Sequence, residues 1–178
     1  MSFCFKNLTE LPEELQLRVR AWRNDPSVRA VMLTSRIISE SEHLKWLAGL
    51  KAGRDRLALI GFDGGRPVGF YQFCAFDRPR GTADSGFYVN PEKSLDNKGY
   101  YAYLLNYYGL SHGFQALRLR GITGSVLDFN TQVLKMLAIF GFKETGRRDS
   151  GAGTLIDFIL TRDGWQERRG RIERVLRL

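Results

Sequence analysis

The chain has 178 residues, 43% of them hydrophobic, which suffices for one compact domain over residues 1–178 with a buried core. Its 27 basic and 19 acidic residues give a net charge of +8. That charge favours an anionic partner such as nucleic acid, a membrane surface or a phosphorylated small molecule, with a solvated basic surface as the alternative. There is no apolar run near the roughly 20 residues that span a bilayer, no signal-peptide layout and no metal-ligand spacing, so we expect a cytoplasmic protein without a metal.

The first third of the chain predicts a strand and two helices. Asp25-Pro26 should end the first helix, because proline lacks the backbone donor that a helix interior needs. Ser39 and Glu42 have the spacing of a capping box, which predicts the start of the second helix. Residues 27–38, between the helices, are polar and irregular in pattern. The predicted elements are a strand at residues 2–6, a helix at 11–23 and a helix that starts at Ser39 and carries Leu50.

The remainder of the chain mixes strands and helices. Asp63-Gly64-Gly65 is typical of a hairpin turn. Cys4 and Cys74 lie in apolar strand-like runs and are predicted to be buried free thiols. The order β-α-α-β-β-β-α-β-α-β-β predicts a mixed α/β (α+β) domain, one sheet with helices on both faces. The predicted elements are strands at 57–62, 68–76 and 86–89, a helix that starts near Gly99, a strand at 117–127, a helix at 131–140, a hairpin of 142–148 with 154–160, and a basic helix at 164–178.

The stretch 86–113 changes from strand to helix periodicity. Asn90-Pro91 should stop the strand, and the helix opens near Gly99. A strand that runs through a glycine-bearing turn into a helix offers free N–H groups and the positive end of a dipole, which suits a phosphate. The alternative is an ordinary connection in which Gly99 supplies backbone freedom.

Two tracts downstream carry a resemblance. Residues 128–130, Asp-Phe-Asn, and residues 139–146, Ile-Phe-Gly-Phe-Lys-Glu-Thr-Gly, resemble the GNAT superfamily of acetyl-CoA-dependent N-acetyltransferases. The resemblance implies a GNAT fold, whose mixed and mostly antiparallel sheet splays apart between strands 4 and 5 to admit the pantetheine arm of acetyl-CoA. An N-cap role competes with cofactor binding at Asn130. The implied cofactor contacts are the N–H of Val89, the pyrophosphate loop at Lys98, Gly99 and Tyr100, and Asn130.

Further tracts resemble a narrower group, the PseH-type enzymes of pseudaminic acid biosynthesis, which N-acetylate a UDP-linked 4-amino-4,6-dideoxy sugar. These tracts include residues 22–26, Met32, residues 43–46 and residues 86–91. The resemblance implies a nucleotide-sugar substrate. By position alone, Arg23 would instead be a helix-end cation, and His43 a surface residue. The implied substrate contacts are Arg23 to the diphosphate, His43 and Trp46 to the phosphate and the uracil or sugar, and Met32 along the same wall.

Acetyl transfer to an amine also needs a proton source for the departing thiolate. Most GNAT relatives use a tyrosine where this chain has Leu137, and leucine cannot donate a proton. Tyr88 matches a tyrosine of the PseH-type enzymes and is the candidate donor; a half-buried sheet aromatic is an equal alternative. Gln72 could hold a water or the sugar, and a cross-strand polar pair explains it equally well.

The sequence therefore predicts an acetyl-CoA-dependent N-acetyltransferase that acts on a nucleotide-linked amino sugar by direct transfer. Acetylation of a protein N-terminus, as by ribosomal-protein acetyltransferases, is a second hypothesis. A basic module that binds nucleic acid through residues 168–177 is a third, disfavoured because the aromatic residues lie in strands and are not interleaved with the basic ones. We expect no nucleic-acid or membrane partner, and the sequence leaves a homodimer open.

Overall fold

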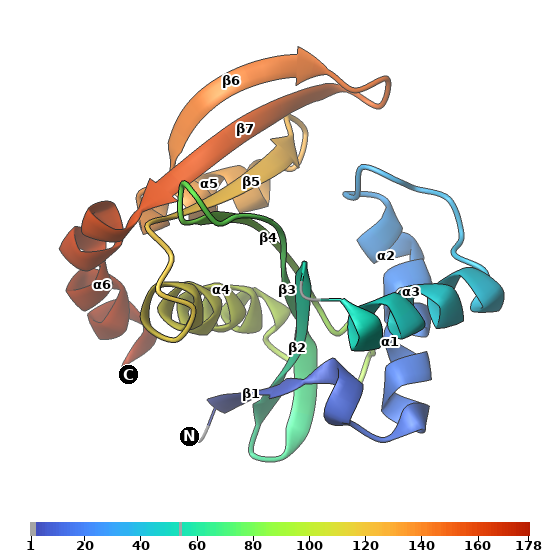
Figure 1. The fold of residues 1–178 in the computed structure, drawn as a ribbon. Coiled ribbons are helices and arrows are strands. Elements are labelled where there is room, and N and C mark those ends of the chain that lie inside the picture. The colour runs from blue at the N-terminus through green and yellow to red at the C-terminus, as the bar shows by residue number, and fades with distance from the viewer. Residues whose placement is uncertain (1–2, 54) are drawn as a thin grey trace. The chain divides into compact units, whose positions relative to one another are not determined.

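The structure is a computed structural model that describes residues 3–53 and 55–178 (Figure 1). Within these ranges, seven strands form one mixed sheet in the order β1-β2-β3-β4-β5-β7-β6. The chain groups into two compact units, a first unit of Met1–Ala75 with Gly86–Asn106 and a second unit of Phe76–Ser85 with Tyr107–Leu178. The single domain expected over residues 1–178 stays a prediction.

Antiparallel strands form the sheet of the first unit. β1 pairs with β2, and β2 pairs with β3 through a hairpin in which Gly64 and Gly65 have φ angles of +55° and +83°. Such left-handed angles at both central residues are those of a two-residue hairpin turn, so the predicted turn is confirmed. The strands are β1 (Phe3–Asn7), β2 (Arg56–Asp63), β3 (Arg66–Asp77) and the end of β4 (Thr82–Val89).

Side-chain caps fix where two helices of the first unit begin. Ser39 accepts a hydrogen bond from the Glu42 N–H, and the Glu42 side chain returns one to the Ser39 N–H, which confirms the capping box of α3. The irregular stretch expected after residue 26 begins instead with a short helix, because Asp25 accepts the Ser27 N–H at 2.9 Å and caps α2. The helices are η1 (Leu8–Glu10), α1 (Glu13–Asn24), α2 (Pro26–Arg29), α3 (Glu40–Ala52) and α4 (Lys98–Gln115), the last belonging to this unit as far as Asn106.

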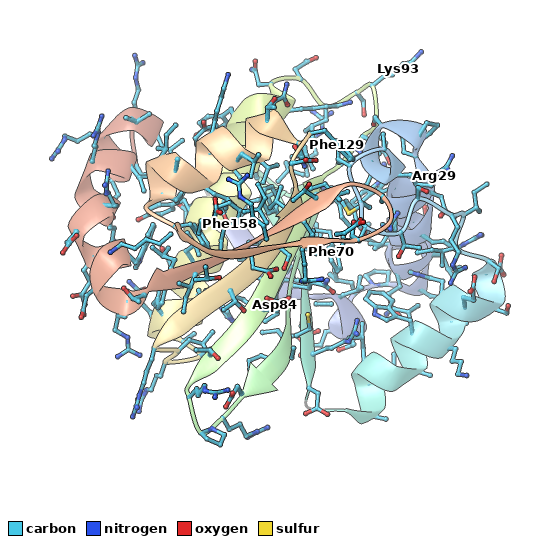
Figure 2. The ribbon with its side chains drawn as sticks, turned by 90° about the horizontal axis from the view of Figure 1, so that it is seen from above. Arg29, Phe70, Asp84, Lys93, Phe129 and Phe158 are labelled. Atoms are coloured by element: carbon cyan, nitrogen blue, oxygen red, sulfur yellow. The ribbon has the colours of Figure 1, made fainter. Side chains whose placement is uncertain are left out.

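Successive residues of β2 face different helices. Ile60 is fully buried in a cluster with residues of α1 and α3. Its neighbour Gly61 faces α4, because a Cβ added there would lie 2.6 Å from Leu105 Cδ2. Helices therefore cover both faces of the sheet in this unit, as expected from the two-residue period of a strand. The cluster on the α1 and α3 face contains Leu8, Val19, Trp22, Leu47, Leu50, Ala58, Ile60, Phe62 and Phe70, the last of which is labelled in Figure 2.

The second unit combines one parallel pairing with antiparallel ones. β4 pairs with β5 in parallel from Thr82 to Asp84, near the start of both strands, whereas β5 pairs with β7 along its whole length. Asp84, labelled in Figure 2, accepts a hydrogen bond from Thr123 Oγ1 at 2.6 Å at the last of these β4–β5 pairs. The elements are β5 (Gly121–Leu127), α5 (Thr131–Phe140), β6 (Lys143–Asp149), β7 (Thr154–Thr161) and α6 (Arg162–Leu176).

The basic tail forms a helix, as predicted. Trp165, Ile172 and Leu176 are buried on one side of α6. The arginines at positions 168, 171, 174 and 177 are exposed. Within the part of the chain that the structure describes, no helix is both long and apolar enough to cross a bilayer, and no three His, Cys, Asp or Glu side chains gather as a metal site would require.

Two expectations from the sequence are wrong. Cys4 is exposed, because β1 turns Phe3 and Phe5 inward and its alternate residues outward, while Cys74 is half buried. The strand expected at 117–127 begins only at Gly121. Its first residues cannot be extended, since Arg118 has a left-handed φ of +55°.

Candidate active site

The end of β4 is fixed by one buried amide. β4 ends at Val89, as the Asn90-Pro91 pair predicted. Asn90 is 2% exposed; its N–H donates to the Val68 carbonyl at 2.9 Å and its Nδ2 to the Pro67 carbonyl at 3.1 Å. Its Oδ1 accepts the Glu92 N–H at 2.9 Å. These bonds hold the backbone that follows Val89 in one conformation.

Glu92, which the sequence gave no reason to select, ties the loop between β4 and α4 to α1. Its carboxylate accepts the Trp22 indole N–H at 2.8 Å and a bidentate pair of hydrogen bonds from Arg18. The Arg18 hydrogen bonds, helped by Trp22, lower the pKa of Glu92 to about 2. No local pattern could reveal this contact, because its partners lie some 70 residues earlier in the chain.

Tyr88 lies between the sheet and α1. Its ring stacks on Phe70 with centroids 4.9 Å apart, and its hydroxyl donates a long hydrogen bond of 3.5 Å to the Val19 carbonyl. Burial raises the pKa of Tyr88, and the nearby Arg23 guanidinium opposes that rise. The hydroxyl therefore carries its proton at neutral pH. Both roles expected for Tyr88, sheet aromatic and proton donor, are compatible with this position.

Arg23 is the charged neighbour of Tyr88. Its Nη2 donates to the Thr34 carbonyl at 2.6 Å. Its Nη1 is buried and has no hydrogen-bond partner among residues 3–53 and 55–178. Burial lowers the pKa of Arg23, and Arg29 lowers it further. A guanidinium donor without an acceptor in a desolvated place is costly unless a ligand supplies the acceptor.

His43 and Trp46 extend this aromatic group along α3. His43 is 5% exposed, and its Nε2 is 2.8 Å from the Gln16 carbonyl, to which it donates. Burial lowers its pKa. The Trp46 ring lies 5.3 Å from His43 and 6.1 Å from Phe70. His43 is thus not the surface residue that its place in the first turn of a helix suggests, and its role as a substrate contact stays a prediction.

Two further predicted residues lie in less constrained places. Met32 is half buried, and its N–H donates to the Arg29 carbonyl at 3.2 Å. Gln72 is also half buried, and a Cβ added at Gly86 on β4 would lie 3.7 Å from its Nε2. The missing side chain at Gly86 therefore leaves room for the Gln72 amide over the strand.

The first turn of α4 has the properties of an anion site. Gly99 is helical without a positive φ, and a Cβ added to it would meet no described atom within 4 Å. Backbone freedom is therefore not what Gly99 supplies; the left-handed residue is Asn97, with a φ of +54°. All of this turn is described, and it holds Lys98 and no acidic side chain. An open helix N-terminus with a cation beside it fits a pyrophosphate group.

Asn130 and Leu137 belong to the second unit. Asn130 Oδ1 accepts the Val133 N–H at 3.4 Å and so caps α5, which is the competing role foreseen for it. Its Nδ2 has no role in that cap. Leu137 is 6% exposed and packs in the interior, so the usual tyrosine position holds only a core side chain.

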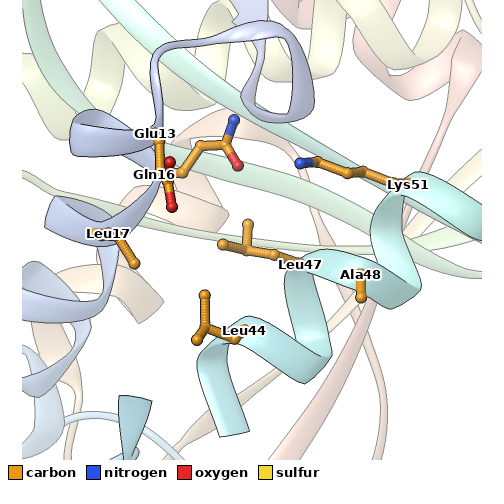
Figure 3. A pocket seen from close by; sticks show the side chains of 7 residues that line it. All are labelled: Glu13, Gln16, Leu17, Leu44, Leu47, Ala48 and Lys51. Carbon is orange, nitrogen blue, oxygen red and sulfur yellow. The ribbon is translucent and has the colours of Figure 1, made fainter. Parts of the chain in front are cut away.

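A cavity of about 300 Å³ lies between α1 and α3 (Figure 3). Its walls combine four apolar side chains with a carboxylate, an amide and an ammonium group, and none of the predicted site residues lines it. The groups that acyl transfer needs are absent from this lining, so it is not the candidate active site. The lining residues are Glu13, Gln16, Leu17, Leu44, Leu47, Ala48 and Lys51.

The structure thus brings some predicted residues together and leaves others apart. In the first unit, Arg23 lies near enough to Tyr88 for its charge to influence the Tyr88 hydroxyl, and the Phe70 ring lies near both Tyr88 and Trp46. The start of α4 follows β4 through the loop that Glu92 anchors. Asn130 belongs to the second unit.

No model of a protein family and no curated protein matches this sequence. Among solved structures, the N-acetyltransferase PseH of Campylobacter jejuni in complex with acetyl coenzyme A aligns with a TM-score of 0.69 at 19% identity, over 90% of this chain and 99% of that one. Spermidine N-acetyltransferase of Vibrio cholerae, in complex with CoA and spermine, aligns with a TM-score of 0.80 at 13% identity, over 92% and 98%. RimJ of Mycobacterium smegmatis, in complex with CoA-disulfide, aligns with a TM-score of 0.78 at 17% identity, over 97% of this chain and 88% of that one. At such identities these alignments show a shared fold.

Proposed function

Because the chain has the GNAT fold, we propose that it is an N-acetyltransferase that passes the acetyl group of acetyl-CoA directly to an amine. One observation supports this most: β4 ends at Val89 and leads into an α4 N-terminus whose open Gly99 and Lys98 fit a pyrophosphate. The solved PseH, spermidine acetyltransferase and RimJ structures are in complex with acetyl-CoA or a form of CoA. Asn130 is an additional proposed contact to the cofactor.

Acetyl-CoA, when bound, supplies an activated acetyl thioester. The backbone N–H of Val89 is the proposed donor to the oxyanion that develops on the acetyl carbonyl. Tyr88 is the proposed general acid, because its buried hydroxyl keeps its proton at neutral pH and lies next to Val89 in the chain. Gln72, on the neighbouring strand, would hold a water or the acceptor near the same place. In the proposed direct transfer the neutral amine attacks the thioester carbonyl, so the N–C bond forms as the C–S bond breaks and no acyl-enzyme is needed. The departing thiolate takes the Tyr88 proton, and the proton that the amine loses passes through solvent and restores it.

For the acceptor we propose a nucleotide-linked amino sugar, of the UDP-4-amino-4,6-dideoxy type. The unpartnered Nη1 of Arg23 supports this, because a guanidinium matches the oxygens of a diphosphate and the site lies in a chain of net charge +8. Trp46 offers a partly buried ring near the same wall, on which Met32 is also proposed to lie. His43 stays a proposed contact; since Gln16 occupies Nε2, only its Nδ1 side is available to a ligand.

Acetylation of a protein N-terminus is the second candidate. The segment after α2 exposes apolar side chains: Val31 is 39% exposed, Leu33 53% and Ile37 65%. Arg23 holds this segment through the Thr34 carbonyl. An exposed apolar segment beside the proposed acceptor wall could contact the first side chains of a peptide.

One experiment separates these candidates. Purified protein is mixed with acetyl-CoA and, in turn, a UDP-4-amino sugar, spermidine and a peptide with a free N-terminus, and release of the CoA thiol is followed. We expect thiol release with the UDP-4-amino sugar, and an increase in melting temperature with acetyl-CoA alone, because a ligand that binds only the native state stabilises it. Turnover of the peptide alone would favour the second candidate. The acetyltransferase proposal would be refuted if acetyl-CoA caused no increase in melting temperature and no acceptor gave thiol release.

A further inference from the structure

The amide nitrogen of a side chain in the middle of α4 is buried without a hydrogen-bond partner among the described residues. Asn106 is 2% exposed, and its Nδ2 forms no hydrogen bond within residues 3–53 and 55–178. An unpaired buried amide donor destabilises the folded state, because it has lost its hydrogen bond to water without a replacement. Its neighbours Leu104 and Leu105 are equally buried and apolar, so the amide is a polar exception in this turn of the helix. A ligand that supplies an acceptor would account for the amide.

Asn106 shares a helix face with Gly99. The two residues are seven positions apart, which is about two turns, so their side-chain directions nearly coincide. Between them on this face lie Ala102 and Tyr103, three and four positions after Gly99, on opposite edges of the face. One edge of the face therefore carries the bare backbone of Gly99, the methyl group of Ala102 and the amide of Asn106, and the Tyr103 ring borders it. Small side chains of this kind allow an extended ligand chain to run close along a helix.

The same turn of α4 lies against the end of β4. Leu105 packs in a cluster with Val68 and Leu95, against which Val89 also packs. A Cβ added at Gly69 would lie 2.5 Å from Leu105 Cδ1 and 3.1 Å from Val89 Cα. Leu105 and Val89 are therefore neighbours on one side of β3. Asn106, the residue after Leu105, therefore lies near the end of β4, where the Val89 N–H is proposed to contact the acetyl group.

From these observations we infer that Asn106 binds the pantetheine arm of acetyl-CoA, with Nδ2 donating a hydrogen bond to an amide carbonyl of the arm; this rests on the proposed function. Along the helix axis Asn106 lies about 10 Å beyond Gly99, where the pyrophosphate is proposed to bind. The β-alanine carbonyl of an extended pantetheine arm is also about 10 Å from its phosphate, since three backbone-like bonds span roughly 3.5 Å. The amide is therefore a positioning contact for the arm.

The test compares two ligands that differ by the arm. Coenzyme A contains it, whereas adenosine 3′,5′-bisphosphate keeps the nucleotide and lacks the arm. Dissociation constants for both are measured by calorimetry on the wild type, Asn106→Leu and Asn106→Ser, each first checked for a cooperative melting transition. Ser111→Ala is the matched control, because Ser111 Oγ is also buried and unpaired on the described part of α4 but faces away from Gly99 by about 120°.

We expect both Asn106 variants to bind coenzyme A roughly three- to tenfold more weakly, as the loss of one hydrogen bond implies, and to bind the bisphosphate as the wild type does. Ser111→Ala should change neither constant. Unchanged coenzyme A affinity, or equal weakening for both ligands, overturns the inference and leaves the proposed function intact. A wild-type protein that binds neither ligand refutes the proposed function and the inference together.

Discussion

The carboxylate of Glu92 accepts the indole N–H of Trp22 at 2.8 Å, so the loop after β4 is bonded to a 1% exposed side chain of α1. The same carboxylate holds Arg18. This contact connects the helix that carries Arg23 to the segment that leads into the proposed pyrophosphate site. Both sides of the candidate active site in the first unit thus depend on one residue for their relative position.

Replacement of Glu92 by leucine should lower the free energy of unfolding by about 1–3 kcal/mol, because the Trp22 N–H would be left buried without an acceptor. Glu92→Gln should cost less, since an amide oxygen can still accept from Trp22. The Arg18 pair itself adds little, because both of its side chains are partly exposed. Urea denaturation measures both losses of stability, provided that the two variants and the wild type have the same m-value. Equal losses for the two variants would contradict the proposed importance of Trp22.

Tyr88→Phe should lower kcat by roughly 100-fold with little change in the KM for acetyl-CoA, because the ring stays on Phe70 and only the proposed proton donor is lost. Tyr107→Phe is the control, since the Tyr107 hydroxyl donates to Glu173 in the second unit. Steady-state kinetics with the accepted substrate measure both. A Tyr88→Phe enzyme with unaltered kcat would remove Tyr88 from the mechanism.

Arg23→Ala should raise the KM for a UDP-linked amino sugar by roughly ten- to a hundredfold, as expected for loss of hydrogen bonds from a charged group. The KM for acetyl-CoA should stay unchanged. Arg36→Ala serves as the control, because Arg36 pairs with Glu42 on the surface. Equal increases in both KM values would mean that Arg23 holds the fold of the 30–38 segment and does not select the substrate.

Asn130→Asp separates the two roles of Asn130. Aspartate is as good an N-cap as asparagine, so the melting temperature should hold. The Nδ2 donor is lost, however, and if it contacts the cofactor the KM for acetyl-CoA should rise several-fold. Asn130→Ala should lose the cap as well and destabilise the protein by about 1 kcal/mol. Wild-type kinetics in Asn130→Asp would leave capping as the only role.

Stability should fall as the pH drops below 6.5 because of His43. Burial lowers its pKa from 6.5, so the unfolded chain binds the proton more readily than the folded protein in this range. The contribution is complete above pH 6.5 and is lost as the pH falls toward the lowered pKa. His43→Gln should flatten this limb of a stability profile between pH 7.5 and 5. Burial also lowers the pKa of His112, so a separate His112 variant distinguishes its contribution from that of His43. If the His43→Gln variant lost stability between pH 7.5 and 5 as the wild type does, the assignment to His43 would be wrong.

The sequence by itself determined the local elements. The capping box at Ser39, the glycine turn at Gly64 and the stop at Asn90-Pro91 all appear where the residues predicted them, since each depends on the conformational preferences of a few neighbouring residues. The alternation of apolar residues predicted most of the strands and helices, but not the short helix α2 or the start of β5 at Gly121. The mixed sheet with helices on both faces, and the GNAT fold, could also be anticipated.

Only the tertiary structure decided which distant side chains meet. The Glu92 contact to Trp22, the burial of His43 against Gln16 and the unpaired donors of Arg23 and Asn106 left no local pattern. Hydrogen bonding and desolvation act on atoms that are close in space, whatever their separation along the chain. The residues that position a reacting group are therefore set by packing between elements, whereas the elements themselves follow from the sequence.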